Sequence, residues 1–293
     1  MKTIQKPYPI LARALGIKEL WLKREDTHIY GSHKGRAIPL MIKEYRKRHH
    51  VRHFVISSSG NAALAAAKAV QKYNENNTDD PISLEILVGP RITEKKRRLL
   101  DAYVDVSITI EQVENPKQTA FGKNKRGEAL FLRQSTDDLA LRGYYPLGQE
   151  ISKIPYVQAV FLPTSSGATA QGISEVFTEL SHPPQIHIVQ TSLCAPMASI
   201  FDTNYTPTDS SIATAICDKI AHRKIPVIDA INNTKGSGWV VSDKEIQAMI
   251  DLVKKTTKMT LSPNGILGLV GLKKAIDNGW KWDGAVVCVV TGA

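Results

Sequence analysis

Short apolar runs of strand length alternate along this chain with segments whose apolar residues recur at helical spacing. The apolar runs predict strands near residues 19–25, 53–57, 82–88, 104–110, 129–134, 159–163, 185–191 and 285–290. The periodic segments predict helices after Lys34 and near residues 61–74, 93–101, 115–125, 147–153, 243–256 and 264–277. Repeated strand–helix units of this kind predict an α/β protein with mainly parallel sheets and helices on both faces.

A lysine stands where the first predicted loop turns into a helix, in the run Gly31-Ser32-His33-Lys34-Gly35-Arg36. The first turn of a helix carries partial positive charge, which is expected to lower the pKa of the Lys34 amine and to increase its nucleophilicity. A neutral lysine amine can form a Schiff base with a carbonyl compound. The hexapeptide by itself is equally compatible with a surface lysine beside a helix start.

Two further loops of small polar residues precede predicted helices. The run Ser57-Ser58-Ser59-Gly60-Asn61 follows an apolar strand, and its hydroxyls and backbone N–H groups suit a carboxylate. The run Pro163-Thr164-Ser165-Ser166-Gly167-Ala168-Thr169 follows a second strand and would hold a phosphate in the same way. Taken singly, each loop is more simply explained as an ordinary helix cap.

Composition indicates a soluble protein. The chain has 293 residues, of which 42% are hydrophobic, enough for a large core or two domains. Its apolar runs are far shorter than the ~20 residues that span a bilayer, so we expect no membrane partner. The N-terminal residues lack the apolar stretch of a signal peptide. Cys194, Cys217 and Cys288 fit neither a zinc pattern nor a disulfide framework, so we expect no metal site and a cytoplasmic location.

The formal net charge of +10 comes partly from basic runs at residues 43–53 and 95–98. Nucleic-acid binding is one interpretation of these runs. The solvated faces of helices are favoured instead, because apolar residues flank the charges at roughly helical spacing. We therefore expect no nucleic-acid partner, although the positive charge would still attract anionic substrates and cofactors.

Together and in this order, these motifs resemble the fold type II pyridoxal-phosphate enzymes, a family that includes threonine synthase, serine/threonine dehydratase and cysteine synthase. The resemblance runs from Lys6 to Ala293 and includes Lys23-Arg24-Glu25-Asp26 and Thr291-Gly292 as further anchors. It implies two open, mainly parallel twisted sheets. It also implies a smaller α/β domain at residues 37–142, inserted into a larger cofactor-binding domain of residues 1–36 and 143–293.

The resemblance also implies roles for single residues. Lys34 matches the lysine that binds the aldehyde of pyridoxal 5'-phosphate, and Thr291 matches a hydroxyl residue facing the pyridine nitrogen. In isolation, Thr291 is better explained as the end of a buried strand. The residues that match the loop for the substrate carboxylate are Ser58, Ser59, Gly60 and Asn61, the last of which also reaches the cofactor. The residues that match the phosphate-binding loop are Thr164, Ser165, Ser166, Gly167, Ala168 and Thr169.

The implied reaction is elimination or replacement at the β or γ carbon of a small amino acid. A hydroxyl such as Thr291 does not force the pyridine nitrogen to be protonated, which favours this chemistry over transamination. Threonine synthase, which converts O-phosphohomoserine to threonine, is the leading expectation because residues 144–151 resemble a threonine-synthase phrase. A plain helix entry explains that phrase equally well.

Alternative activities stay open. They are serine/threonine ammonia-lyase, cysteine-synthase-type β-replacement, and a binding protein that keeps the fold without the reaction. The last of these is suggested by Ser262, which stands where related enzymes often carry Glu-Pro. The family often forms dimers, so a homodimer is also open.

Overall fold

The computed structural model describes residues 2–292, so Ala293, where the resemblance ends, lies outside the described residues. The chain divides into two compact units, Met1–His28 with Tyr144–Ala293 and Ile29–Gly143. Residues 29–36 and Gly143 therefore group with the smaller unit and not with the larger one. The reason is helix α2 (Lys34–His49), which begins at Lys34 and packs along helix α3 (Asn61–Glu75) of the smaller unit.

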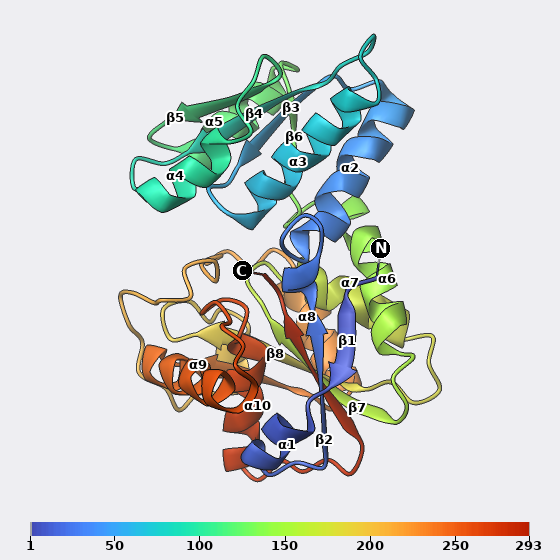
Figure 1. Ribbon diagram of the computed structural model, residues 1–293, viewed down its shortest axis with the longest axis vertical. Coiled ribbons are helices and arrows are strands. Elements are labelled where there is room, and N and C mark those ends of the chain that lie inside the picture. The colour runs from blue at the N-terminus through green and yellow to red at the C-terminus, as the bar shows by residue number, and fades with distance from the viewer. Residues whose placement is uncertain (1, 293) are drawn as a thin grey trace. The chain divides into compact units, whose positions relative to one another are not determined.

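The larger unit is built on a six-stranded sheet with the strand order β1-β2-β10-β7-β8-β9 (Figure 1). Only the edge strand β1 is antiparallel to its neighbour, and the other pairs are parallel. The strand bounds are β1 (Ile4–Pro7), β2 (Glu19–Arg24), β7 (Val157–Pro163), β8 (Gln185–Thr191), β9 (Ser237–Val241) and β10 (Ala285–Val290). Every residue of β10 is buried, as expected for a central parallel strand covered on both faces.

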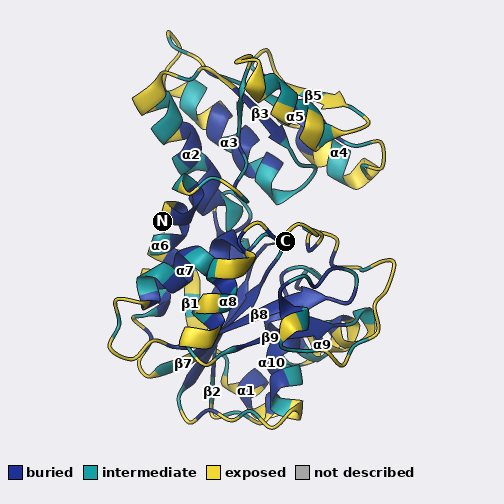
Figure 2. Ribbon diagram, turned by 180° about the vertical axis from the view of Figure 1, so that it is seen from behind, coloured by how far each residue is buried: buried dark blue, intermediate teal, exposed yellow. Residues whose placement is uncertain are grey.

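Helices cover both faces of this sheet, as the alternating pattern predicts. The helices are α1 (Pro9–Leu15), α6 (Leu139–Ile151), α7 (Ala168–Phe177), α8 (Lys224–Asn233), α9 (Asp243–Thr257) and α10 (Leu267–Asp277). One core cluster joins the sheet to α1, α9 and α10, through residues such as Leu11, Ile246 and Leu267. A second cluster joins it to α7 and α8, through residues such as Ile173 and Val227. Figure 2 shows the inner strands of this unit mostly in dark blue between helices with exposed outer faces, whereas the edge strand β1 is mostly exposed.

The smaller unit contains a four-stranded, wholly parallel sheet with the order β5-β4-β3-β6. Its strands are β3 (His53–Ser57), β4 (Ser83–Val88), β5 (Ile108–Gln112) and β6 (Leu130–Phe131). Besides α2 and α3, its helices are α4 (Glu94–Asp101) and α5 (Pro116–Lys125). The two-sheet α/β architecture agrees with the fold expected from the resemblance.

Local hydrogen bonds explain where the predicted bounds of two strands differ from those in the structure. Strand β5 begins at Ile108 and not near 104, because the Asp105 carboxylate accepts the backbone N–H groups of Ser107 and Ile108 in a turn. The expected strand at 129–134 shortens to β6, since the chain turns where Arg133 O accepts the N–H groups of Thr136 and Asp137. The sequence pattern did not predict β1, α1, α8 or β9.

Strand β9 was missed because it carries Gly238, a residue type that is unusual within strands. A Cβ at Gly238 would lie 2.7 Å from the Cα of Ala198, so the backbone of residue 198 occupies the space of a side chain. This close approach belongs to the tertiary structure and leaves no periodic signal.

Carboxylates lie against several cations of the basic runs. Arg46 and Arg52 both pair with Asp80, Arg48 pairs with Glu44, and Arg98 pairs with Glu94 at 2.5 Å. Within residues 2–292, no helix is long and apolar enough to cross a membrane, and no cluster of three His, Cys, Asp or Glu side chains could hold a metal ion.

Candidate active site

Lys34 is the first residue of α2, as the sequence predicts, and His33 is its N-cap. The turn before it is closed by Ser32, whose carbonyl accepts the N–H of Gly35 and whose hydroxyl accepts the N–H of Lys34. Arg36, two residues on, is buried. The amine of Lys34 therefore extends from the positive end of a sixteen-residue helix, the position that motivates its assignment as a nucleophile.

The loop at residues 58–61 lies at the N-terminal end of α3, with Gly60 as the N-cap. The Ser58 hydroxyl accepts the N–H of Gly60, and residues 57–61 are all partly exposed. A Cβ built at Gly60 would meet no atom of the described residues within 4 Å, so open space faces the loop there. An anion can approach these N–H groups and hydroxyls at the helix end.

Topology places Lys34 and this loop at the same edge of the smaller sheet. Helix α2 ends at His49 and strand β3 begins at His53, so the two run in opposite directions. The start of α2 therefore lies at the carboxyl end of β3, which is where Ser58 and Asn61 follow. Figure 1 shows α2 and α3 beginning at the same end of the smaller unit.

The second loop, residues 164–169, belongs to the larger unit and leads from β7 into α7. Thr164 is tied to the sheet, because its N–H donates to Val189 O and its hydroxyl donates to Leu162 O. The hydroxyl oxygen of Ser165 accepts the N–H groups of Cys217 and Asp218, each at 3.3 Å. Gly167 is the N-cap of α7 and has a φ of +89°, which favours glycine.

Thr291 follows β10, the strand adjacent to β7. Because Cys288 pairs with Phe161 in parallel register, Thr291 and Thr164 lie three residues beyond that pair on neighbouring strands. Thr291 is 6% exposed, and its hydroxyl donates to Asn264 O at 3.4 Å. The structure thus places Thr291 at the same carboxyl edge as the 164–169 loop.

The segment around Ser262 holds this end of β10. The Ser262 hydroxyl donates to Gly292 O at 2.8 Å and accepts the N–H of Gly265 at 3.0 Å. A Cβ at Gly265 would lie 2.6 Å from Gly292 O. Ser262 therefore has a structural role here, closing the turn behind Thr291.

Arg223 is a residue of this region that sequence reasoning missed. It is the N-cap of α8, it is 5% exposed, and its guanidinium donates to Gln171 Oε1 at 2.9 Å. Its Cβ lies 3.3 Å from the position of a Cβ on Gly167. One sequence feature could have indicated an anion site at Arg223. The arginine directly precedes a helix whose first turn contains no acidic residue.

Two helix N-termini and a buried cation thus border the 164–169 loop. Neither α7 nor α8 has an aspartate or glutamate in its first turn, so no acidic residue of these turns offsets the positive charge of the helix ends. Gly167 also excludes a side chain, since a Cβ would lie 2.9 Å from Val227 Cγ2. The backbone N–H groups at these helix ends, the hydroxyls of the loop and the Arg223 guanidinium form a donor set that fits a phosphate group.

The segment at residues 144–151 lies within α6, and its polar side chains contact other parts of the larger unit, to which it belongs. The Tyr145 hydroxyl donates to Glu175 Oε2 at 2.5 Å, and Glu175 Oε1 accepts from Gln171 at 2.9 Å. Glu150 pairs with Lys23, whose side chain is 1% exposed. These contacts give the segment a structural role. It forms the interior and the end of α6, which begins at Leu139, so its interpretation as a helix entry near residue 147 is wrong.

Comparison with known proteins decides the family. A model of the family described as "Pyridoxal-phosphate dependent enzyme" matches residues 3–292. The chain belongs to this family of pyridoxal-phosphate-dependent enzymes. Its cofactor is pyridoxal 5'-phosphate, and the 164–169 loop fits the phosphate of that cofactor.

Relatives of the enzyme differ in sequence identity and in the share of the chain that they match. Threonine synthase of Methanocaldococcus jannaschii is 24% identical over 308 residues, covering 96% of this chain and 72% of the relative. Threonine synthase of Mycobacterium tuberculosis is 37% identical over 83 residues, only 28% of this chain and 23% of that protein's length. The structure of maize serine racemase superposes with a TM-score of 0.84 at 16% identity, covering 100% of this chain and 88% of that one. The racemase likeness shows the fold alone.

Proposed function

We propose that this enzyme acts on a small amino acid by elimination or replacement at the β or γ carbon, with threonine-synthase-like conversion of O-phosphohomoserine to threonine as the first candidate. One observation carries the proposal: Lys34 and the 58–61 loop begin neighbouring helices at one edge of the smaller sheet. A nucleophilic amine and a carboxylate site are the two groups that an amino-acid substrate requires. The matches to threonine synthases support the choice of reaction.

Each predicted residue has a proposed role. Ser58, Ser59, Gly60 and Asn61 would hold the substrate carboxylate at the N-terminal end of α3. The phosphate of the cofactor would be held by Thr164, Ser165, Ser166, Gly167, Ala168 and Thr169 at the N-terminal end of α7. Arg223 would add charge to that site, since a buried guanidinium beside a helix N-terminus is stabilised by a bound anion.

Two residues would govern the chemistry. Lys34 Nζ would bind the cofactor aldehyde in the absence of substrate and, when released, take the proton from the substrate Cα. The Thr291 hydroxyl would face the pyridine nitrogen without forcing its protonation. Bound pyridoxal phosphate supplies a sink for the negative charge that develops at Cα. Orientation of the substrate by its carboxylate would keep Cα within reach of the amine.

Variants of two lysines on α2 test the proposal. We expect Lys34→Ala to abolish turnover and borohydride-trapped cofactor, whereas Lys43→Ala, an exposed lysine on the same helix, keeps both. Unchanged trapping in Lys34→Ala would refute the role of Lys34. Products formed from O-phosphohomoserine, threonine, serine and O-acetylserine then distinguish the synthase from an ammonia-lyase or a β-replacement enzyme.

A binding protein without the reaction would give a different result. It would stay colourless when supplied with pyridoxal phosphate, and it would convert none of these substrates. Ser262 does not favour this alternative, because its hydrogen bonds assign it to the turn behind Thr291.

A further inference from the structure

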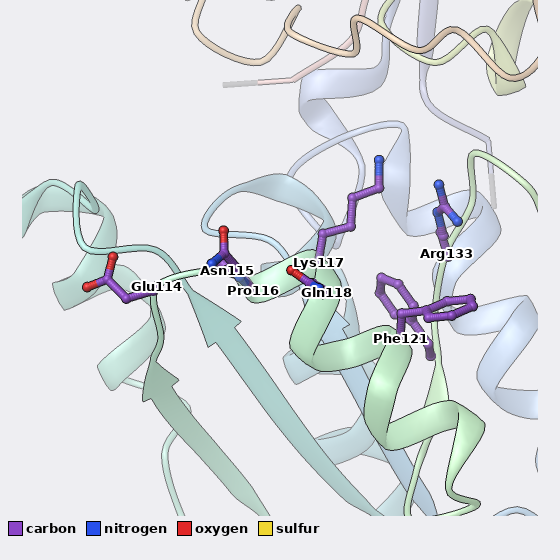
Figure 3. Close-up of a pocket in the computed structure, with 8 residues that line it drawn as sticks. Glu114, Asn115, Pro116, Lys117, Gln118, Phe121 and Arg133 are labelled. Carbon is purple, nitrogen blue, oxygen red and sulfur yellow. The ribbon is translucent and has the colours of Figure 1, made fainter.

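A pocket of about 430 Å³ opens in the smaller unit, within the range of about 300–1,000 Å³ that is usual for ligand sites (Figure 3). It lies where the loop after β5 meets the segment after β6. Its lining residues are Glu114, Asn115, Pro116, Lys117, Gln118, Phe121, Phe131 and Arg133. All strands of this sheet are parallel, so the pocket opens at their carboxyl edge, where ligands of open α/β sheets are usually found.

The apolar part of the lining comes from two phenylalanines. Phe121 is 55% exposed although its neighbour Ala120 on α5 is completely buried. Phe131 is partly buried and packs against the core cluster of this sheet, which fixes its ring in place. A half-exposed ring beside a fixed one offers an aromatic surface that a flat apolar group would cover.

The polar part of the lining contains two cations, two amides and one carboxylate. Lys117 and Arg133 extend toward the same side of the pocket as seen in Figure 3, and Glu114 is directed away from them. Asn115 is the N-cap of α5, yet among the described residues its side chain makes no cap hydrogen bond. Its amide can therefore turn to a ligand. The lining thus complements a negative charge more than a neutral or positive one.

We propose that this pocket binds a small molecule in which an anionic group, phosphate or carboxylate, is attached to an aromatic or compact apolar body. The anion lies between Lys117 and Arg133, and the body covers Phe121 and Phe131. The proposal goes beyond the reaction, because none of these residues has a role in it.

Calorimetric titration of the cofactor-loaded enzyme tests this site, because loading fills the 164–169 loop. Phenyl phosphate is the probe, with inorganic phosphate and phenol as its separate halves. We expect phenyl phosphate to bind more tightly than either half. Lys117→Ala and Phe121→Ala should each weaken binding about tenfold. Lys125→Ala changes a lysine of the same helix that does not line the pocket, and it should bind as the unchanged enzyme does.

Two further titrations test the specificity and the location of this binding. Benzoate in place of phenyl phosphate shows which anion the site prefers, and binding of either supports the proposal. Lys34→Ala should keep the affinity for phenyl phosphate, because Lys34 does not line the pocket. The proposal is overturned if phenyl phosphate binds no better than inorganic phosphate, if the pocket variants bind unchanged, or if Lys34→Ala loses the binding. None of these outcomes alters the reaction assignment, which rests on the products.

Discussion

A Cβ on Gly167 would lie 2.9 Å from Cγ2 of Val227, so the loop that begins α7 has no room for a side chain at this position. The φ of +89° at Gly167 adds a backbone preference for glycine. We expect Gly167→Ala to lower the free energy of unfolding by about 2–3 kcal/mol, from backbone strain and overpacking together. The variant should also weaken pyridoxal phosphate binding.

Urea unfolding and absorbance titration with the cofactor measure the two effects. The double variant Gly167→Ala with Val227→Ala removes the contact but keeps the φ requirement. Partial recovery of the cofactor affinity is expected, and full recovery would show that the backbone conformation of residue 167 is unimportant.

Arg223 should contribute to phosphate binding by its charge. Arg223→Gln keeps a polar side chain but removes the cation beside α7, and we expect about tenfold weaker binding of inorganic phosphate to the cofactor-free enzyme. Thermal shift with phosphate gives the comparison. Lys224→Ala, which removes the neighbouring exposed cation, is the matched control, and an equal loss in both variants would mean that only long-range charge matters.

The buried ion pair of Lys23 and Glu150 is expected to contribute to the free energy of unfolding. Lys23 is 1% exposed and also donates to Thr3 O, so its ammonium is buried with Glu150 as its charged partner. We expect Glu150→Ala to cost about 3–5 kcal/mol, because an uncompensated charge stays buried. Replacing both residues, Lys23→Met with Glu150→Leu, should recover most of the loss in urea unfolding. A double variant as unstable as the single one would contradict this explanation.

His187 predicts a pH dependence of stability. It is stacked on Phe161 with ring centroids 4.4 Å apart, and its Nδ1 accepts the indole N–H of Trp239 at 3.2 Å. Burial lowers the pKa of His187 to about 3. The unfolded chain, with a histidine pKa of about 6.5, therefore binds a proton that the folded protein does not, and stability falls as the pH decreases from about 6.5 toward 3.

The expected slope from this residue is up to about 1.4 kcal/mol per pH unit below pH 6. Urea unfolding between pH 4.5 and 8 measures it. His187→Gln should lack this component, whereas His182→Gln, at an exposed histidine, should keep it. Identical slopes in the two variants would show that other groups cause the acid sensitivity.

Sequence reasoning was most successful where chemistry is local. The start of α2 at Lys34, the start of α3 after Gly60 and the start of α9 at Asp243 depend on residues within a turn of each other. It failed where the backbone of a residue distant in the sequence determines the local structure. An example is Gly238, where the backbone of Ala198 leaves no space for a side chain. Arg223 was missed for the same reason, since nothing near it in the sequence reveals its approach to Gly167.

The order of apolar and polar residues by itself predicted most of the alternating strands and helices, and small polar residues at strand ends predicted the candidate anion-binding loops. The tertiary structure alone decided which of these ends meet at one edge of a sheet. It also decided that Arg223 borders the 164–169 loop, that residues 144–151 stabilise the larger unit, and that Lys117 and Arg133 share a pocket. The physical reason is that hydrogen bonding within a helix or strand depends on neighbouring residues, whereas burial and charge proximity depend on which segments pack together.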